Sequence, residues 1–359
     1  MSKIRFAVIG AGWISQEAFL PAVSQTGNAE VTAIVSSDAG KAAKLAAFHG
    51  IPSVYDYSQF DVMAKSGAVD AVYIATPNSS HCEYAVRAAR HGLHCLVEKP
   101  LATTAADSET MIDAARKAGV FLMTAYRLHN DPATIKAMEL VRQGAIGEVR
   151  HFSSVFSFQL AAGNHRLQPG HWGGPLQDLG VYCLNAARHV FGTNPLRVSA
   201  MSSFGNGDPR FKDVEEGLTV ALEFPGSRLA QFYVGFGTDA MDMYQILGTK
   251  GSITLWNGYR FEMARRLAVQ RNDSTEKTNF ERTDNFSGMI AYFADCIREN
   301  RNPLPDGEEG LADMQVLAAI EASHRELKPQ AISCSQRFQT LGLDMLRSFP
   351  PSRDKLLLT

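Results

Sequence analysis

The stretch "IRFAVIGAGWIS", residues 4–15, decides the fold of the first part of the chain. Six residues of buried-strand composition lead straight into Gly10-Ala11-Gly12, and a helical pattern follows. In this context Gly10 permits a tight turn, and Gly12 lets the backbone approach a pyrophosphate at the helix N-terminus. Ser15 replaces a third glycine with a residue small enough for close packing. The turn therefore predicts a dinucleotide site, and a tight turn in another α/β fold is the alternative.

Strands and helices alternate from this turn to about residue 126. Alternation of this kind predicts a parallel sheet that is covered by helices on both faces. Strands are expected at 4–9, 30–35, 69–77, in "LHCLVEKP" up to Val97, and at 120–126, where the composition is that of buried strands. Helices are expected from the turn to about Gln25 and at 39–50, 81–92 and 103–119.

The pattern changes after about residue 128. A helix is expected within 130–147, with Asp131 as its cap and Pro132 in its first turn. Successive strands with turn signals run from 197 to about 270 and predict an antiparallel sheet. A further strand is expected at 148–160, and further helices at 175–191, 287–300 and 307–327. The predicted fold is an α/β Rossmann domain (1–127) followed by an α+β domain (128–359) with a large open, mostly antiparallel sheet.

Composition limits the classes of function. Of 359 residues, 45% are hydrophobic and 20% charged, and the net charge of −2 leaves no broad basic surface for nucleic acid or an anionic membrane. No apolar stretch approaches 18 residues, so no membrane span is expected. The N-terminal apolar run enters the glycine turn without a small-residue cleavage site, which favours a first strand over a signal peptide. Five cysteines without a CxxC pair favour a reducing, cytoplasmic compartment, and no ligand triad suggests a metal.

The corner after the second strand, "VSSDAGKAAK" (35–44), bears on the choice of cofactor. An acid at this corner bonds the ribose 2′-OH of NAD, whereas hydroxyls with a nearby base suit the 2′-phosphate of NADP. Ser36, Ser37 and Lys41 can bind a phosphate. Asp38 is the counter-indication, because it could serve NAD. The chemistry favours NADP, with NAD as the less favoured alternative.

The stretch "CLVEKPLA", residues 95–102, ends an apolar strand with Glu98, Lys99 and Pro100. Ligands of open α/β sheets bind beyond the carboxyl ends of the strands, so Lys99 is expected to point where a nicotinamide would lie. Pro100 restricts the preceding residue to extended geometry and so fixes its direction. A surface salt bridge at a strand exit is the alternative.

The helix expected at 175–191 carries a polar stripe. Asp178, Tyr182, Asn185 and His189 follow one another at i, i+4, i+7 and i+11, which places them on one face. Most of the remaining surface is apolar. The stripe is either a solvent-exposed face or the lining of a substrate cleft.

Four motifs in this order, "GAGWIS", "ATPNSSH" (75–81), "EKP" (98–100) and "DLGVYCLN" (178–185), resemble the Gfo/Idh/MocA oxidoreductases. The resemblance covers nearly the whole chain and is greatest to the glucose–fructose oxidoreductase branch. It implies a Rossmann domain, then an open sheet that supplies the substrate pocket and often the oligomer contact. A homodimer or homotetramer through that sheet is therefore expected.

The resemblance also implies roles for particular residues. Lys99 matches the active-site lysine, Asp178 the helix carboxylate, and Tyr182 a position that is histidine in many members. Substrate contacts are expected for Lys99, Asp178, Tyr182 and Asn185. A tryptophan precedes Arg166 in relatives, where this chain has His165. Cofactor contacts are expected for Gly10, Gly12, Trp13, Ile14, Ser36, Ser37, Lys41, Ala75, Thr76, Pro77, Asn78, His81, Glu98, Lys99, Arg127 and Arg166.

The expected reaction is reversible hydride transfer between a sugar or polyol carbon and the nicotinamide. Oxidation needs a base for the hydroxyl proton, and an unperturbed tyrosine, with a pKa of about 10, is a poor one near neutrality. A cation within ~4–6 Å favours the phenolate, so we expect Lys99 to assist Tyr182 and to bond the reacting oxygen. The alternatives are an aldose–ketose or aldose–aldose oxidoreductase with tightly bound NADP, a dehydrogenase of non-sugar cyclic diols, and a regulator that has lost the chemistry.

Overall fold

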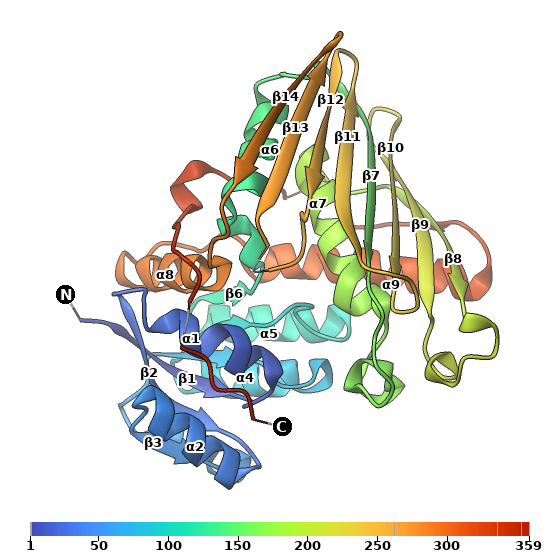
Figure 1. Cartoon of the computed structure of the whole chain (residues 1–359). Helices are drawn as coiled ribbons and strands as arrows, with labels where there is room; N and C mark the ends of the chain where they lie inside the picture. Colours follow the sequence, from blue (N-terminus) through green and yellow to red (C-terminus); the bar gives the residue numbers. More distant parts are fainter. Residues whose placement is uncertain (1, 262, 336, 353, 359) are drawn as a thin grey trace. The chain divides into compact units, whose positions relative to one another are not determined.

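The computed structural model describes every residue except 1, 262, 336, 353 and 359 and resolves two compact units, many of whose helices and strands are labelled in Figure 1. The first unit comprises Met1–Asp131, Thr283–Leu311 and Met345–Thr359, and the second comprises Pro132–Arg282 and Ala312–Asp344.

A six-stranded parallel sheet forms the centre of the first unit. Its strand order, β3-β2-β1-β4-β5-β6, is that of a Rossmann fold and confirms the predicted class. Only the short edge strand β3 has no counterpart among the predicted strands, because three residues are too few to carry a pattern. The strands are β1 (Ile4–Ile9), β2 (Ala29–Val35), β3 (Ser53–Tyr55), β4 (Ala71–Ile74), β5 (His94–Val97) and β6 (Leu122–Thr124).

Helices connect these strands, and most begin and end where the sequence predicts. Asp38 caps the first turn of α2, Thr104 caps α5, and left-handed glycines end both helices. The helix after the glycine turn differs, since it opens with a π-helical turn. The helices of this unit are η1 (Ser15–Phe19), α1 (Leu20–Val23), α2 (Ala39–His49), η2 (Tyr57–Gln59), α3 (Phe60–Ala64), η3 (Asn78–Ser80), α4 (His81–Arg90), α5 (Ala105–Ala118), η4 (Arg127–Asn130), α8 (Asn285–Arg298) and the start of α9 (Gly307–Glu326).

The helix α8 belongs to the first unit, although the sequence division at residue 127 places it in the second domain. It packs against α1, β1 and β2, where the Phe293 ring lies 6.3 Å from that of Phe6. The side-chain amide of Gln25 donates to the Ser287 hydroxyl at 2.9 Å. A linear pattern identifies an apolar helix but not the sheet that it covers, so the sequence does not reveal that the chain returns to this unit.

The second unit is built on a nine-stranded sheet in the order β14-β13-β12-β11-β7-β10-β9-β8-β15. All neighbours are antiparallel except β7 and β10, so the predicted mostly antiparallel sheet is confirmed. β14 lies beyond the predicted strand region, because its largely exposed residues carry no apolar alternation. The strands are β7 (Val149–Ser157), β8 (Arg197–Ser203), β9 (Gly217–Phe224), β10 (Arg228–Gly235), β11 (Met241–Gly248), β12 (Gly251–Trp256), β13 (Arg265–Arg271), β14 (Ser274–Phe280) and β15 (Gln330–Ala331).

Helices pack against this sheet, with α7 on β7 and α6 on β12 and β13. Large apolar side chains elsewhere on the strands stay exposed, including Met201 (74%), Leu229 (53%) and Met241 (50%). The helices of this unit are α6 (Pro132–Arg142), η5 (His165–Leu167), η6 (Pro169–His171), η7 (Leu176–Gly180), α7 (Val181–Phe191), η8 (Gly205–Gly207), η9 (Pro209–Phe211), η10 (Leu343–Met345, ending at the unit boundary) and the remainder of α9.

Candidate functional site

The two glycines of the turn after β1 are required for different reasons. Gly10 has a φ of 104°, and a Cβ there would lie 2.7 Å from the Ala75 carbonyl oxygen, so the loop after β4 excludes any side chain. A Cβ on Gly12 would meet no described atom within 4 Å. The packing of the protein therefore does not demand glycine at position 12. The open space at Gly12 is compatible with the predicted close approach of a pyrophosphate to the backbone.

Two side chains tie the first helix to this turn. The buried Ser15 hydroxyl donates to the Gly10 carbonyl oxygen at 2.6 Å, and the Gln16 amide donates to that of Ala11 at 2.8 Å. Ser15 thus fixes the turn in addition to packing closely, as the sequence predicts. The sequence does not predict this role of Gln16, because nothing in its spacing distinguishes it from a surface glutamine. Trp13, a predicted cofactor contact, is half-exposed beside the turn.

The corner after β2 presents the groups expected for a phosphate. Asp38 is the N-cap of α2, and its Oδ1 accepts the Lys41 backbone N–H at 2.8 Å, so this oxygen is already engaged by the helix. Ser36 is buried and its hydroxyl oxygen accepts the Asp38 N–H at 3.2 Å, while Ser37 is exposed. The arrangement leaves Ser37 and the side chain of Lys41 at a helix N-terminus, which favours an anion.

The loop after β4 carries a buried polar atom with no partner within the described chain. The Thr76 hydroxyl oxygen is solvent-inaccessible and makes no hydrogen bond there. Buried polar groups are nearly always satisfied, so this hydroxyl fits a hydrogen bond to a bound dinucleotide. Pro77 is exposed and Asn78 partly so, as expected for residues that lie along a cofactor. His81 is different: its ring is fully buried between two backbone carbonyl groups.

At the carboxyl end of β5, Glu98 turns inward. Its Oε1 accepts the Tyr73 hydroxyl at 2.6 Å, and its Oε2 accepts the Lys99 backbone N–H at 3.2 Å. Burial raises the pKa of the Glu98 carboxyl, although the Tyr73 bond and the charges of Lys99 and Arg127 oppose this. The burial of Glu98 argues against a surface salt bridge at this strand exit. The Lys99–Pro100 peptide bond is cis, and Lys99 is partly exposed.

Replacing Glu98 with Gln is expected to make thermal stability relative to the parent higher at neutral pH than at acid pH. Because the folded pKa is raised above the ordinary value of about 4.3, the folded protein binds this proton more tightly than the unfolded chain. That stabilisation is complete below about pH 4.3 and is lost as the pH rises through the folded pKa. Glutamine stays neutral and its oxygen still accepts the Tyr73 bond, whereas its amide nitrogen cannot accept the Lys99 N–H, a loss that is the same at every pH. Melting curves across pH should show the variant gaining about 2 °C toward neutrality, and a gap independent of pH would contradict this.

Arg127 lies in the interior of the first unit. It is 4% exposed, and its Nη1 donates a long hydrogen bond of 3.5 Å to the Asn285 side-chain oxygen. Asn285 in turn donates to the Asp131 carboxylate at 3.2 Å. These contacts connect η4 to α8, so they supply a structural reason for Arg127 besides its predicted cofactor contact.

In the second unit, Asp178 and Arg166 form an ion pair. The Arg166 Nε lies 2.8 Å from the Asp178 Oδ2, and both side chains are largely buried. Tyr182 is the second residue of α7 and is partly exposed. Its ring packs edge-on against Phe156, at 5.9 Å between centroids, and beside Tyr259, at 6.3 Å. Asp178 and Tyr182 thus have fixed orientations while Tyr182 keeps access to solvent.

The second half of the predicted polar stripe is buried. The Asn185 amide donates to the Asp313 Oδ2 at 2.9 Å, and Arg188, which is fully buried, pairs with the Asp313 Oδ1 at 2.5 Å. His189 is also buried, with the Phe338 ring 5.1 Å away. The spacing of the stripe is as predicted, but residues from α9 and beyond cover half of it. Asn185 therefore has a partner in the protein interior, which argues against its predicted contact with substrate.

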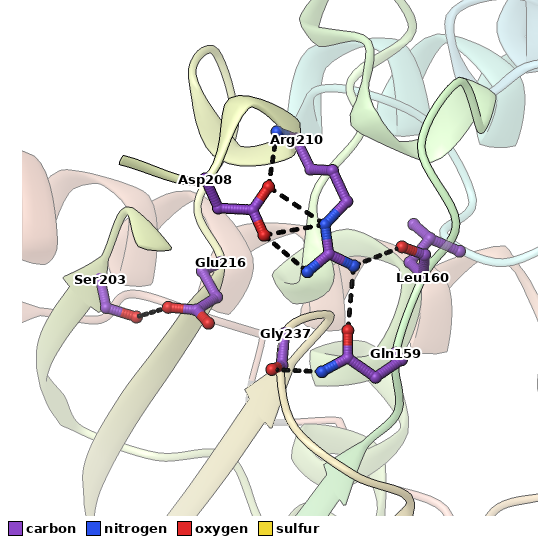
Figure 2. A network of polar contacts seen from close by, with 7 residues as sticks. All are labelled: Gln159, Leu160, Ser203, Asp208, Arg210, Glu216 and Gly237. Atoms are coloured by element: carbon purple, nitrogen blue, oxygen red, sulfur yellow. Dashed lines mark hydrogen bonds and ion pairs between the residues drawn. The ribbon is translucent and has the colours of Figure 1, made fainter. Parts of the chain in front are cut away.

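A network around Arg210, shown in Figure 2, is not indicated by the sequence. Its guanidinium group pairs with Asp208 at 2.7 Å and donates to the Gln159 side-chain oxygen at 2.9 Å and the Leu160 carbonyl oxygen at 2.7 Å. The Gln159 amide donates to the Gly237 carbonyl oxygen at 2.6 Å. The network joins the segments after β7 and β10 to the β8–β9 loop. It thereby fixes the base of the loop that carries Arg166.

The described residues contain no group of three or more His, Cys, Asp or Glu side chains that could hold a metal ion. Within the same part of the chain, no helix combines the length and apolar character needed to cross a membrane. All five cysteines, each in a described position, are free thiols.

Comparison with known protein families gives matches over both units. Residues 4–126 match an oxidoreductase family described as having an NAD-binding Rossmann fold, and residues 134–254 match a GFO/IDH/MocA C-terminal domain. The D-xylose 1-dehydrogenase (NADP(+)) of Haloarcula marismortui is 32% identical over 334 residues, which cover 90% of this chain and 92% of that protein.

Two solved structures are similar over most of the chain. The aldose-aldose oxidoreductase of Caulobacter crescentus, complexed with glycerol, has a TM-score of 0.88 and 32% identity, covering 92% of this chain and all of that one. A 3-ketoreductase of Actinomadura kijaniata, in complex with TDP-benzene and NADP, has a TM-score of 0.80 and 26% identity, covering 90% and 98%.

Proposed function

Because the chain belongs to the Gfo/Idh/MocA family of oxidoreductases, we propose that it is an NADP-dependent enzyme that transfers a hydride between the nicotinamide and a sugar or polyol carbon. The observation that carries the proposal is Lys99 at the carboxyl end of β5, directly after a buried carboxylate that is bonded at both oxygens. The fold places ligands beyond this end of the sheet. The named activities of the xylose dehydrogenase and the aldose-aldose oxidoreductase support the substrate class.

The residues of the first unit fit NADP. We assign the pyrophosphate to the turn at Gly10–Gly12, a dinucleotide hydrogen bond to the Thr76 hydroxyl, and the 2′-phosphate to Ser36, Ser37 and Lys41. The bound nicotinamide supplies or accepts the hydride. The engagement of Asp38 as a helix cap supports NADP over NAD.

We assign the proton transfer to the Tyr182 hydroxyl. In alcohol oxidation this oxygen takes the proton of the reacting hydroxyl group, and in reduction it returns the proton. Lys99 stabilises negative charge on the reacting oxygen through its ammonium group. Asp178, held by Arg166, accepts a hydrogen bond from a neighbouring substrate hydroxyl group. Asn185 is left out, because it is bonded to Asp313.

A panel assay tests the function. Purified protein with NADP⁺ is expected to oxidise at least one aldose or polyol, and turnover with NAD⁺ should be weaker. If the protein oxidised non-sugar cyclic diols and no sugar, the proposed substrate class would be wrong and cyclic diols would take its place. Complete inactivity toward alcohols and carbonyl compounds, with NADP bound, would favour a regulator.

An aldose–aldose or aldose–ketose oxidoreductase that retains its cofactor is the second candidate, and the similarity to the Caulobacter enzyme favours it. If the protein is of this kind, a sample that was purified without added cofactor should release NADP when it is denatured. A homodimer or homotetramer through the second sheet, where Met201 and Leu229 are exposed, stays a prediction that light scattering can measure. A cytoplasmic location likewise stays a prediction, open to cell fractionation.

Replacing Lys41 with Ala is expected to raise the Kd for NADPH about tenfold, since a charged hydrogen bond to the 2′-phosphate contributes about 1.5 kcal/mol. The Kd for NADH should hardly change. Lys44→Ala is the matched control, because Lys44 is an exposed lysine of the same helix. Titration of nucleotide fluorescence gives both constants. An equal loss of affinity for NADPH and NADH would mean that Lys41 does not bind the 2′-phosphate.

A further inference from the structure

His81 links the loops that follow β4 and β5. Its Nδ1 lies 3.0 Å from the Pro100 carbonyl oxygen, and its Nε2 lies 3.1 Å from the Thr76 carbonyl oxygen. The ring is fully buried. Both loops lie at the carboxyl edge of the parallel sheet, so one imidazole bridges two segments that the proposed function assigns to cofactor and catalysis.

The bond to Pro100 acts on the residue next to Lys99. The Lys99 backbone is held from the other side by the Glu98 carboxylate, which accepts its N–H at 3.2 Å. The peptide groups on either side of the Lys99–Pro100 bond thus have hydrogen-bond partners: the Lys99 N–H bonds Glu98, and the Pro100 carbonyl oxygen contacts His81. These two contacts hold the backbone on both sides of the Lys99 side chain.

The two ring nitrogens are not equivalent. Both of their partners are carbonyl oxygens, which only accept, and a neutral imidazole has one N–H to donate. Burial lowers the pKa of His81, and the nearby Lys99 charge acts in the same direction, so the neutral ring is favoured. The ring therefore donates to one of its two partners and only lies against the other.

We propose that His81 is a positioning residue for Lys99, acting through an Nδ1–H donated to the Pro100 carbonyl oxygen. The inference rests on the proposed function, in which Lys99 contacts the reacting oxygen. It also replaces the predicted contact between His81 and the cofactor, because a fully buried ring with both nitrogens against the backbone presents no edge to a ligand.

Two substitutions separate the two nitrogens. Asparagine places its amide nitrogen near the position of Nδ1, and glutamine places its amide nitrogen near that of Nε2. We expect His81→Asn to keep kcat within about threefold of the parent, while His81→Gln and His81→Ala lose about tenfold to a hundredfold, since small misplacements of a catalytic group have effects of this size. The Kd for NADPH should change little in all three variants.

His94→Ala is the control for loss of a partly buried, hydrogen-bonded imidazole. The His94 Nδ1 accepts the Phe121 N–H at 2.9 Å at the opposite, amino end of β5. Its loss should lower the melting temperature and leave kcat near the parent value. If His81→Ala behaves like His94→Ala, with lower stability and full turnover, His81 is only structural and the proposal is overturned. Retention of kcat by His81→Gln and loss by His81→Asn would overturn it too, because the Thr76 bond would then be the one that matters.

The double variant His81→Ala/Lys99→Ala separates this inference from the proposed function. If His81 acts through Lys99, the double variant should have the kcat of Lys99→Ala alone. A further loss of tenfold or so would show that His81 acts by another route. Full turnover by Lys99→Ala would instead refute the proposed role of the lysine, whatever the His81 variants do.

Discussion

Replacing Lys99 with Ala is expected to lower kcat by at least about a hundredfold while the protein still binds NADPH. Removal of one preorganised group that stabilises developing charge typically has an effect of about 10²–10³. The ammonium group is proposed to act on the reacting oxygen, whereas the turn and the ribose corner hold the nucleotide, so binding and turnover should separate. Steady-state kinetics with the preferred sugar and titration of NADPH fluorescence measure the two effects.

Two further lysine variants complete this test. Lys99→Arg keeps the charge but replaces a compact ammonium group with a planar guanidinium, so turnover should recover only in part. Lys117→Ala removes an exposed lysine at the end of α5 and should leave kcat unchanged. Turnover that survives Lys99→Ala largely intact would refute the assignment.

Tyr182→Phe should lower kcat by about 10³, because it removes the proposed acid and base, and general acid–base catalysis contributes about 10²–10⁴. The phenylalanine ring keeps the packing against Phe156 and Tyr259, so stability should be preserved. The pH dependence of kcat/KM before and after the substitution is the informative measurement. In the oxidation direction, the rise of kcat/KM with pH that a general base produces is expected to be lost in the variant.

Tyr259→Phe is the matched control. Tyr259 is fully buried, its hydroxyl lies 2.7 Å from that of Ser154, and burial raises its pKa well above the ordinary value. Such a phenol cannot serve as a base near neutrality, so its loss should affect stability and not the rate. Near-normal rates for Tyr182→Phe would place the base on another residue.

Local patterns in the sequence predict most of the helices and strands and the part of the candidate site that lies in the first unit. The glycine turn, the alternation of strands and helices, and the charged pair after β5 each depend on residues close together in the chain. Their positions at the carboxyl edge of a parallel sheet follow from the fold alone. For this reason the sequence indicates both the Rossmann fold and Lys99 without any knowledge of distant contacts.

Contacts between distant segments account for what the sequence does not reveal. Asn185 has the spacing of a cleft residue, but Asp313, 128 residues later, occupies its amide. His81 has the composition of a cofactor loop, but its ring turns toward Pro100, 19 residues on. Arg210 pairs with Asp208 close by in the sequence, but its partner Leu160 is 50 residues away. Each case depends on a pairing that periodicity and composition do not encode.

The return of α8 and of residues 345–358 to the Rossmann unit has a consequence for synthesis on the ribosome. Domains that are continuous in the chain can fold in order as they emerge. Here the surface of α1, β1 and β2 that α8 covers stays exposed until β7–β14, eight of the nine strands of the second sheet, have been translated. Residues 1–127 by themselves therefore lack the helix that covers this surface of the first unit.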